Sequence, residues 1–362
     1  MTAFAETYEE ARAAFRLAAQ QAGARLEAAA IPGEGVDGEA LTIDWALIGS
    51  EGAAKTLLSI SGTHGAEGHA GSVAQRAFLE VLDREAVDGG CNILMVHALN
   101  PWGLSHGHRV NAENVDLSRN FCDFEQPRPD NPLYDRIHAA VCPDIWREGM
   151  LDRAQELYDA LAAEVGHRAA LTGFTGGQYV QDDGLAFGGR GPSPSHLVLR
   201  RIVELELACC RQLALLEWHT GGGAYGEPLI MALQPADDPA RRRMDDWWTG
   251  QAVQGPEQAF ESGETPDWAG LLFHGLQRWL PDTEITGAPI EVGTVSSVQA
   301  FEAVMIDRWL RLGSGPVDAR LRETVRSRLR AAYDPPDPAW RASVARVGEA
   351  LHRDAWRGLL RW

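Results

Sequence analysis

The chain has 362 residues, of which 45% are hydrophobic, so it can bury a large core as one α/β domain or as two smaller domains. Its 33 basic and 51 acidic residues give a formal net charge of -18, which repels phosphate backbones and anionic lipid and argues against binding to nucleic acid or to a membrane surface. The first residues lack the basic-then-apolar pattern of a signal peptide, and no run of about 18 apolar residues occurs, so we expect a soluble, cytoplasmic protein.

Apolar runs alternate with helical patterns along the chain. Short runs rich in apolar and β-branched residues predict strands at 41–48, 55–61, 91–99, 213–221 and 288–294. Apolar residues spaced three and four apart predict helices at 71–82, 195–210 and 296–310. Strands that are separated by helices indicate a mainly parallel sheet covered on both faces.

The segment 172–195 is rich in Gly, Pro and polar residues and is longer than a plain connector, so we expect it to be functional or mobile. After Gly313 the pattern is almost entirely helical. The sequence contains no internal repeat and no linker that would divide it. We therefore expect a single domain over 1–362, with helical additions at about 1–35 and 313–362.

Polar side chains gather where predicted strands end. The stretch LLSISGTHGAEGHAG, 57–71, runs from a strand into a Gly-rich loop that carries His64 and Glu67, and LLEWHTGGG places His219 at the end of another strand. Glu291 lies within the short apolar strand of APIEVGT, where a carboxylate is unfavourable unless it is paired or functional. Ligands of open α/β sheets bind beyond the carboxyl ends of the strands. Two histidines and one carboxylate from separate strand ends match a catalytic zinc site, which uses three protein ligands and leaves a fourth position open.

The stretch NPWGLSHGHRVNAENVDLSRNFCDF, 100–124, makes this pattern more specific. A strand followed by N-P-x-G, an arginine and V-D-L-x-R-N-F resembles the zinc carboxypeptidases of the carboxypeptidase A-like superfamily. The order of the motifs, H-x-x-E, Arg-rich loop, strand-end His and strand Glu, is also similar to theirs. The phrases GGQY and DGLAFGG suggest an uncharacterised bacterial branch of it, known as a domain of unknown function. The resemblance covers about 57–310, leaves the terminal helices unexplained, and implies an α/β/α sandwich around a mixed, mostly parallel sheet.

The resemblance also implies roles for the motif residues. His64, Glu67 and His219 would hold one zinc ion per chain, whose Lewis acidity lowers the pKa of water to about 7 and polarises a carbonyl. Glu291 would act as the general base and pass the proton to the leaving amine. Arg109 would stabilise the oxyanion.

Further motif residues would bind the substrate or support the ligands. Arg119 would clamp a substrate carboxylate, for which its planar fork is suited. The superfamily commonly has an asparagine before this arginine, whereas Ser118 stands here, so we expect a looser clamp. Asp116 would orient a ligand histidine. Either Tyr179 or Tyr225 would offer a phenol to the substrate.

Several of these residues have an alternative structural interpretation. Arg109 and Arg119 would otherwise form structural salt bridges, and Asp116 would cap a loop. Glu217 either supports His219 from the same strand face or is a strand-edge acid. We expect His69 to face away from the site on its helix.

The function expected from the sequence is that of a zinc-dependent hydrolase that cleaves an amide bond in the manner of a carboxypeptidase. Its substrate would be a peptide or small molecule with a carboxylate. A zinc-dependent deacylase of small N-acyl amino acids is the alternative among enzymes. A non-catalytic zinc-binding relative is the alternative outside them, and Glu291 argues against it because such a relative is expected to lack the base.

Overall fold

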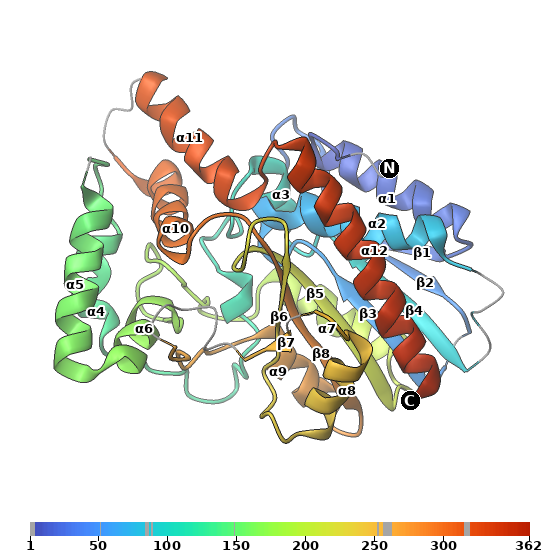
Figure 1. Ribbon diagram of the computed structural model, residues 1–362. Helices are drawn as coiled ribbons and strands as arrows, with labels where there is room; N and C mark the ends of the chain where they lie inside the picture. Colours follow the sequence, from blue (N-terminus) through green and yellow to red (C-terminus); the bar gives the residue numbers. More distant parts are fainter. Residues whose placement is uncertain are drawn as a thin grey trace.

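The structure is a computed structural model that describes residues 4–362 except 51, 84–86, 88–89, 148, 252, 256–262 and 315–318. A mixed eight-stranded sheet forms the centre of this described part (Figure 1), with the strand order β1-β2-β4-β3-β5-β8-β6-β7. The strands are β1 Arg25–Glu34, β2 Ala40–Ile48, β3 Lys55–Ile60, β4 Cys91–His97, β5 Gln212–Gly221, β6 Pro228–Met231, β7 Val253–Gln254 and β8 Glu284–Gly293. The four central strands β4, β3, β5 and β8 are parallel, and so are β6 and β7 at one edge. The pairs β1–β2, β2–β4 and β6–β8 are antiparallel. This arrangement confirms the expected mixed, mostly parallel sheet.

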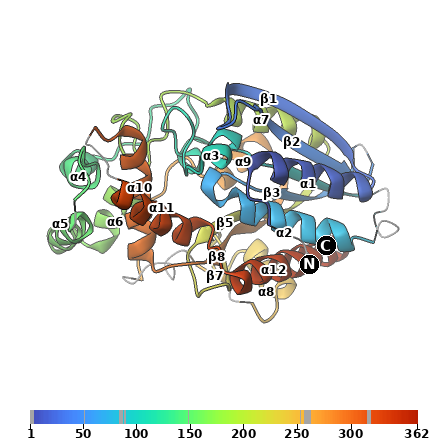
Figure 2. The same cartoon turned by 90° about the horizontal axis from the view of Figure 1, so that it is seen from above.

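Helices cover both faces of the sheet, as Figure 2 shows from above. One face carries α1 Tyr8–Gln21, α2 Gly68–Val81, α8 Pro239–Trp247 and α12 Pro338–Arg361, and the other carries α7 Pro194–Glu206 and α9 Leu272–Trp279. Successive residues of a strand point to opposite faces. In β3, Leu57 accordingly packs into the core under α2 and α12, whereas Leu58 packs into the core under α7 and α9. A strand that is buried on both faces reads as a continuous apolar run, which is why the central strands could be recognised.

A separate group of helices lies beside the sheet and contains α4 Tyr134–Val141, α5 Met150–Val165, α6 His167–Thr175, α10 Ser297–Leu312 and α11 Ala319–Tyr333 (Figure 1). These helices share a third hydrophobic core, which includes Phe174, Trp309 and Tyr333. Ala66, from the loop after β3, packs into the same core. The helical group therefore reaches the end of the sheet where the central parallel strands finish.

The terminal segments differ in part from the expectation. The N-terminal addition is helical only as far as Gln21, and β1 then forms an edge strand over Arg25–Glu34, so the expectation of a helical segment up to about residue 35 was wrong there. No residue of β1 is fully buried, so its sequence lacks the apolar run that marked the central strands. The C-terminal segment is helical as expected, over α11 and α12; residues 1–3 and 315–318 lie outside the described residues.

The long helix α12 is an integral part of the sheet's cover. Val344, Leu351, Ala355 and Leu359 are buried in the core that also holds Leu57. None of the helices in the described ranges combines the length and the apolar character that crossing a membrane would require.

Candidate metal centre

The strand ends of β3 and β5 bring three possible metal ligands together. His64 lies four residues after β3, and Glu67 closes a short 3-10 turn, Gly65–Glu67, that leads into α2. His219 lies near the end of β5, which is the parallel neighbour of β3. The turn packs tightly, because a Cβ atom at position 65 would lie 2.2 Å from the backbone C atom of Gly103. Only glycine fits there, which explains why Gly65 stands between the two candidate ligands His64 and Glu67.

The donor atoms of His64, Glu67 and His219 converge on one buried point. The Nδ1 atoms of the two histidines are 3.2 Å apart, and the Glu67 carboxylate oxygens lie 2.9 Å from His64 Nδ1 and 3.2 Å from His219 Nδ1. Tetrahedral zinc with ligand bonds of about 2.0–2.1 Å requires donor atoms roughly 3.3 Å apart. The spacing of the three donors therefore fits a zinc ion bound between them.

Each of the two histidines turns its other ring nitrogen toward a carboxylate. His64 Nε2 lies 3.2 Å from Asp116 Oδ1, and His219 Nε2 lies 3.1 Å from Glu217 Oε1. Thr63 Oγ1 donates to Glu217 over 3.0 Å and fixes that carboxylate. Carboxylates in this position orient metal-binding histidines and increase their basicity. The structure thus places Asp116 beside His64 and Glu217 beside His219, which is the arrangement that an orienting role of these two carboxylates would need.

The acidic side chains around this centre outnumber the arginines, which favours a bound cation. Four carboxylates lie here, those of Glu67, Asp116, Glu217 and Glu291. Two guanidinium groups, those of Arg109 and Arg119, lie beside them. When all six groups are ionised and both histidines are neutral, two negative charges remain, and one divalent cation would neutralise them. Burial opposes ionisation, yet the charges of Arg109 and His64 hold the pKa of Asp116 well below its usual range.

Arg109 is held from two directions. Its guanidinium forms an ion pair with Asp116 through Nη1, and its backbone N–H donates to Asp307 Oδ2 over 3.2 Å. Its carbonyl oxygen accepts from the backbone N–H of Gly65, over 3.0 Å. The Arg109 segment is therefore fastened to the loop that carries His64 and Glu67. One guanidinium nitrogen of Arg109, Nη1, thus forms a structural salt bridge, which was the alternative interpretation of this residue. The side chain also lines the small cavity described below.

Arg119 is held by backbone carbonyl groups instead of by an acid. Its Nε and Nη2 donate to the carbonyl oxygen of Thr175 over 3.2 and 2.9 Å, and Nη1 donates to that of Ser118 over 2.9 Å. A guanidinium has five N–H groups. Two of them, one on each terminal nitrogen, therefore stay available for a ligand, and these two form the fork that binds a carboxylate. Gly177 permits this packing, because a Cβ there would lie 2.8 Å from Arg119 Cδ, and its φ of +102° is in the region that favours glycine.

The segment 172–195 supports this arginine. Its Tyr179 donates its hydroxyl hydrogen to the carbonyl oxygen of Arg119 over 2.7 Å and lies outside the set of residues that line the metal-site cavity. The structure thus places Tyr179 behind Arg119 and not at a substrate position. Tyr225 is 52% exposed, and its hydroxyl donates to Asp337 Oδ2 over 3.0 Å.

Glu291 faces the cluster from the next strand. It lies opposite His219 in the parallel register of β5 and β8, and its Oε2 accepts from the backbone N–H of Gly222 over 3.4 Å. Burial raises the pKa of Glu291, and the charge of Glu67 adds to this, although His219 and His64 oppose it. A carboxylate with a raised pKa is a better proton acceptor than an ordinary one. Glu291 is not one of the three clustered donors.

A small cavity of about 110 Å³ joins these groups. Its polar wall is formed by His64, Arg109, Ser118, Arg119, Glu217, His219 and Glu291, and its apolar wall includes Trp268, Leu271, Leu272 and Phe273. The structure thus brings the two proposed ligand histidines, the two arginines, Ser118 and Glu291 around one space.

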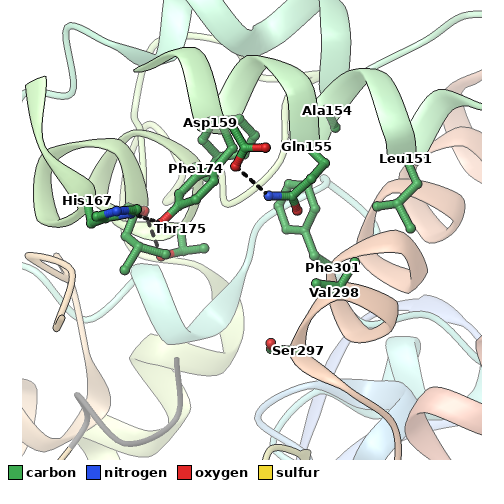
Figure 3. Close-up of a pocket in the computed structure, with 12 residues that line it drawn as sticks. Leu151, Ala154, Gln155, Asp159, His167, Phe174, Thr175, Ser297, Val298 and Phe301 are labelled. Carbon is green, nitrogen blue, oxygen red and sulfur yellow. Dashed lines mark hydrogen bonds between the residues drawn. The ribbon is translucent and has the colours of Figure 1, made fainter. Parts of the chain in front are cut away.

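A larger cavity of about 440 Å³ lies between α5, α6 and the start of α10 (Figure 3). Its walls are mostly apolar and include Leu151, Phe174, Val298 and Phe301. Polar side chains also line this cavity, among them Gln155, which donates a hydrogen bond to Asp159. Thr175 also lines this cavity, and its carbonyl oxygen is the acceptor for Arg119.

Other histidines lie outside the cluster. His69 is partly exposed on α2, and its buried Nδ1 makes no hydrogen bond within the described residues. His106 contacts the carbonyl oxygen of Glu34, and His108 Nδ1 lies 2.7 Å from Asp307 Oδ1. Asp307, which holds both His108 and the backbone of Arg109, was not identified from the sequence. Its signal would have been a charged residue between apolar ones in the helical stretch VMIDRW.

Comparison with known proteins places the chain in a family. The model of the family described as "Protein of unknown function (DUF2817)" matches residues 4–347, which confirms the expected assignment to an uncharacterised family. No curated protein matches the chain.

The fold is similar to several solved structures. A metallo-carboxypeptidase from Burkholderia cenocepacia is 14% identical, with 97% of this chain and 68% of that chain covered and a TM-score of 0.47. The carboxypeptidase A from Helicoverpa armigera is 14% identical, with 91% and 74% covered and a TM-score of 0.40. The ectoine utilization protein EutE (DoeB) from Ruegeria pomeroyi is 15% identical, with 81% and 70% covered and a TM-score of 0.39.

Proposed function

We propose, from the premise that the chain belongs to the DUF2817 family, a family of unknown function, that it is a zinc-dependent hydrolase of amide bonds. The observation that carries this proposal is the convergence of His64, Glu67 and His219 on one buried point, with Glu291 and Arg109 at the same cavity. Three protein donors at this spacing suit a catalytic zinc ion, which keeps a position open.

The chemistry divides between the ion and the protein. When bound, zinc would supply Lewis acidity, which polarises a carbonyl and lowers the pKa of water. Glu291 would accept the proton of the attacking water and deliver it to the nitrogen of the leaving amine. Its raised pKa favours the uptake of this proton, and the protonated carboxyl group can then donate to the more basic amine nitrogen.

Arg109 and Arg119 would serve different parts of the substrate. Arg109 would donate to the carbonyl oxygen as negative charge builds on it, with a guanidinium that Asp116 already holds in place. Arg119 would bind a carboxylate with the two N–H groups that its contacts to Thr175 and Ser118 leave available. Ser118 lines the cavity beside it and offers a hydroxyl.

The size of the cavity favours a small substrate. At about 110 Å³ it is well below the roughly 300–1,000 Å³ of ordinary ligand pockets. An acetyl-sized group fits within such a volume, whereas a longer chain would have to extend beyond it. This observation supports the second candidate, a zinc-dependent deacylase of small N-acyl amino acids.

Hydrolysis assays of the zinc-loaded protein test the proposal. A panel of N-acyl amino acids and short peptides should contain substrates that are cleaved at the amide bond. Glu291→Gln should keep the zinc and lose roughly 100-fold or more in turnover, the scale of general acid–base catalysis. Glu284→Gln is the matched control, since Glu284 is an exposed residue at the other end of β8. Zinc binding without any hydrolysis would instead identify a non-catalytic relative.

A further inference from the structure

Tyr333 comes from the C-terminal helices and ends beside the metal centre. It is the last residue of α11, Ala319–Tyr333. Thr220, which follows His219, donates its hydroxyl hydrogen to the carbonyl oxygen of Tyr333 over 2.8 Å. Thr294, three residues after Glu291, donates in the same way to the carbonyl oxygen of Ala332 over 2.7 Å. The end of α11 is therefore fixed to the ends of the two strands that carry His219 and Glu291.

The phenol of Tyr333 is buried and has no hydrogen-bond partner. The residue is 4% exposed, and its hydroxyl oxygen makes no hydrogen bond within the described part of the protein. A buried hydroxyl that lacks a partner is costly, and most buried polar groups in proteins have one. A group that is left unpaired at a candidate active site is therefore available to a ligand.

The surroundings of Tyr333 belong to the candidate centre. It packs in the same hydrophobic core as Ala66, which lies between the ligands His64 and Glu67. Burial raises the pKa of the phenol, the charge of Arg109 opposes this, and the charges of Asp307, Glu67 and Asp116 add to it. The phenol is thus protonated at neutral pH and can donate one hydrogen bond.

We propose that Tyr333 is a further catalytic residue, whose hydroxyl donates a hydrogen bond to the substrate oxygen that gains negative charge, together with Arg109. The proposal rests on the proposed amide hydrolysis. Tyr333 does not itself line the small cavity, so the oxygen that receives both bonds would have to lie at the Arg109 end of it, because the charge of Arg109 acts on this phenol. A neutral donor beside a guanidinium adds stabilisation where charge develops. It would also give the C-terminal helices a function that the resemblance to carboxypeptidases does not provide.

The test is Tyr333→Phe, which removes one oxygen atom. Because that oxygen makes no hydrogen bond within the described part of the protein and its burial is costly, the melting temperature should stay unchanged or rise, and the zinc content should stay unchanged. Turnover should fall roughly 100-fold, as when one donor to an oxyanion is removed, with KM changed much less. The matched control is Tyr8→Phe, since Tyr8 is equally buried but exchanges hydrogen bonds with the backbone of Thr42 on the far side of α1. Tyr8→Phe should lower the melting temperature by roughly 2–4 °C and leave turnover unchanged.

A binding measurement keeps this test independent of hydrolysis. Acetohydroxamate offers a carbonyl oxygen to the zinc-loaded protein, and its dissociation constant should rise ten-fold or more in Tyr333→Phe. If the natural protein cleaves amides and Tyr333→Phe changes neither turnover nor acetohydroxamate binding, the proposal for Tyr333 is overturned while the proposed function stands. If no amide is cleaved but acetohydroxamate binding is weakened, the proposed function fails and the donor role stands. A lower melting temperature in Tyr333→Phe, with turnover and binding preserved, would show a structural role and overturn the proposal.

Discussion

Replacement of Arg119 by lysine tests whether this arginine selects a substrate carboxylate. Three contacts to the carbonyl oxygens of Thr175 and Ser118 fix the guanidinium and leave a fork of two N–H groups for a ligand. Lysine keeps the positive charge but has a single nitrogen, so it cannot hold this position and present two parallel donors. At least one hydrogen bond to the carboxylate should be lost.

The expected size of this effect follows from that one bond. A hydrogen bond to a charged group contributes about 1.5–3 kcal/mol, which corresponds to roughly 10- to 150-fold in kcat/KM. The assay compares kcat/KM for an N-acyl amino acid with a free carboxylate and for its amide. Arg119→Lys should reduce the ratio of the two values by this factor. Because both substrates are measured on the same preparation, partial unfolding of the variant cancels from the ratio.

Two further variants complete the comparison. Arg200→Lys, on the exposed face of α7 where Arg200 pairs with Glu204, should leave the ratio unchanged. Ser118→Asn supplies an amide donor beside Arg119 and should raise the ratio. A ratio in Arg119→Lys equal to that of the natural protein would refute the reasoning, and Arg119 would then be a structural residue of the 172–195 segment.

Two other predictions concern the supporting residues of the centre and of the core. Glu217→Gln should weaken zinc binding about 10–100-fold in a chelator competition, because His219 loses its carboxylate partner; unchanged affinity would show that Glu217 does not act through the metal. Burial lowers the pKa of His352 to about 4, against roughly 6.5 in an unfolded chain. The folded state therefore favours the neutral imidazole, and the stability that His352 contributes is present above pH 6.5 and is lost as the pH falls toward 4. The free energy of unfolding should therefore drop by about 2 kcal/mol between pH 7 and pH 5 through His352 alone, and urea titrations of His352→Gln should show a pH dependence that is smaller by this amount. An identical pH dependence in the variant would contradict this assignment.

The sequence predicted those parts of the site that have a local signature. His64, Glu67 and His219 each follow or end an apolar strand, and parallel strands finish at one edge of the sheet, so their convergence could be inferred without a structure. Glu291 was marked by a charge within an apolar strand. The central strands were recognisable because burial on both faces leaves a continuous apolar run.

Residues that act over a long sequence separation left no such signature. Asp307 holds Arg109 across 198 residues of sequence, and Tyr333 reaches the centre from a helix whose pattern indicates only an amphipathic surface. The orientation of Arg119 depends on hydrogen bonds to backbone carbonyl groups. Every residue has a carbonyl group, so these contacts leave no signal in the sequence of side chains. The edge strand β1 was missed because none of its residues is fully buried.

The zinc content of the purified protein tests the central claim most directly. Elemental analysis of the natural protein should find about one zinc ion per chain. His64→Ala and His219→Ala should each lose most of it, whereas His106→Ala, which changes a histidine outside the cluster that contacts the carbonyl oxygen of Glu34 and the ring of Trp102, should keep it. Undiminished zinc in both His64→Ala and His219→Ala would contradict the assignment of the centre.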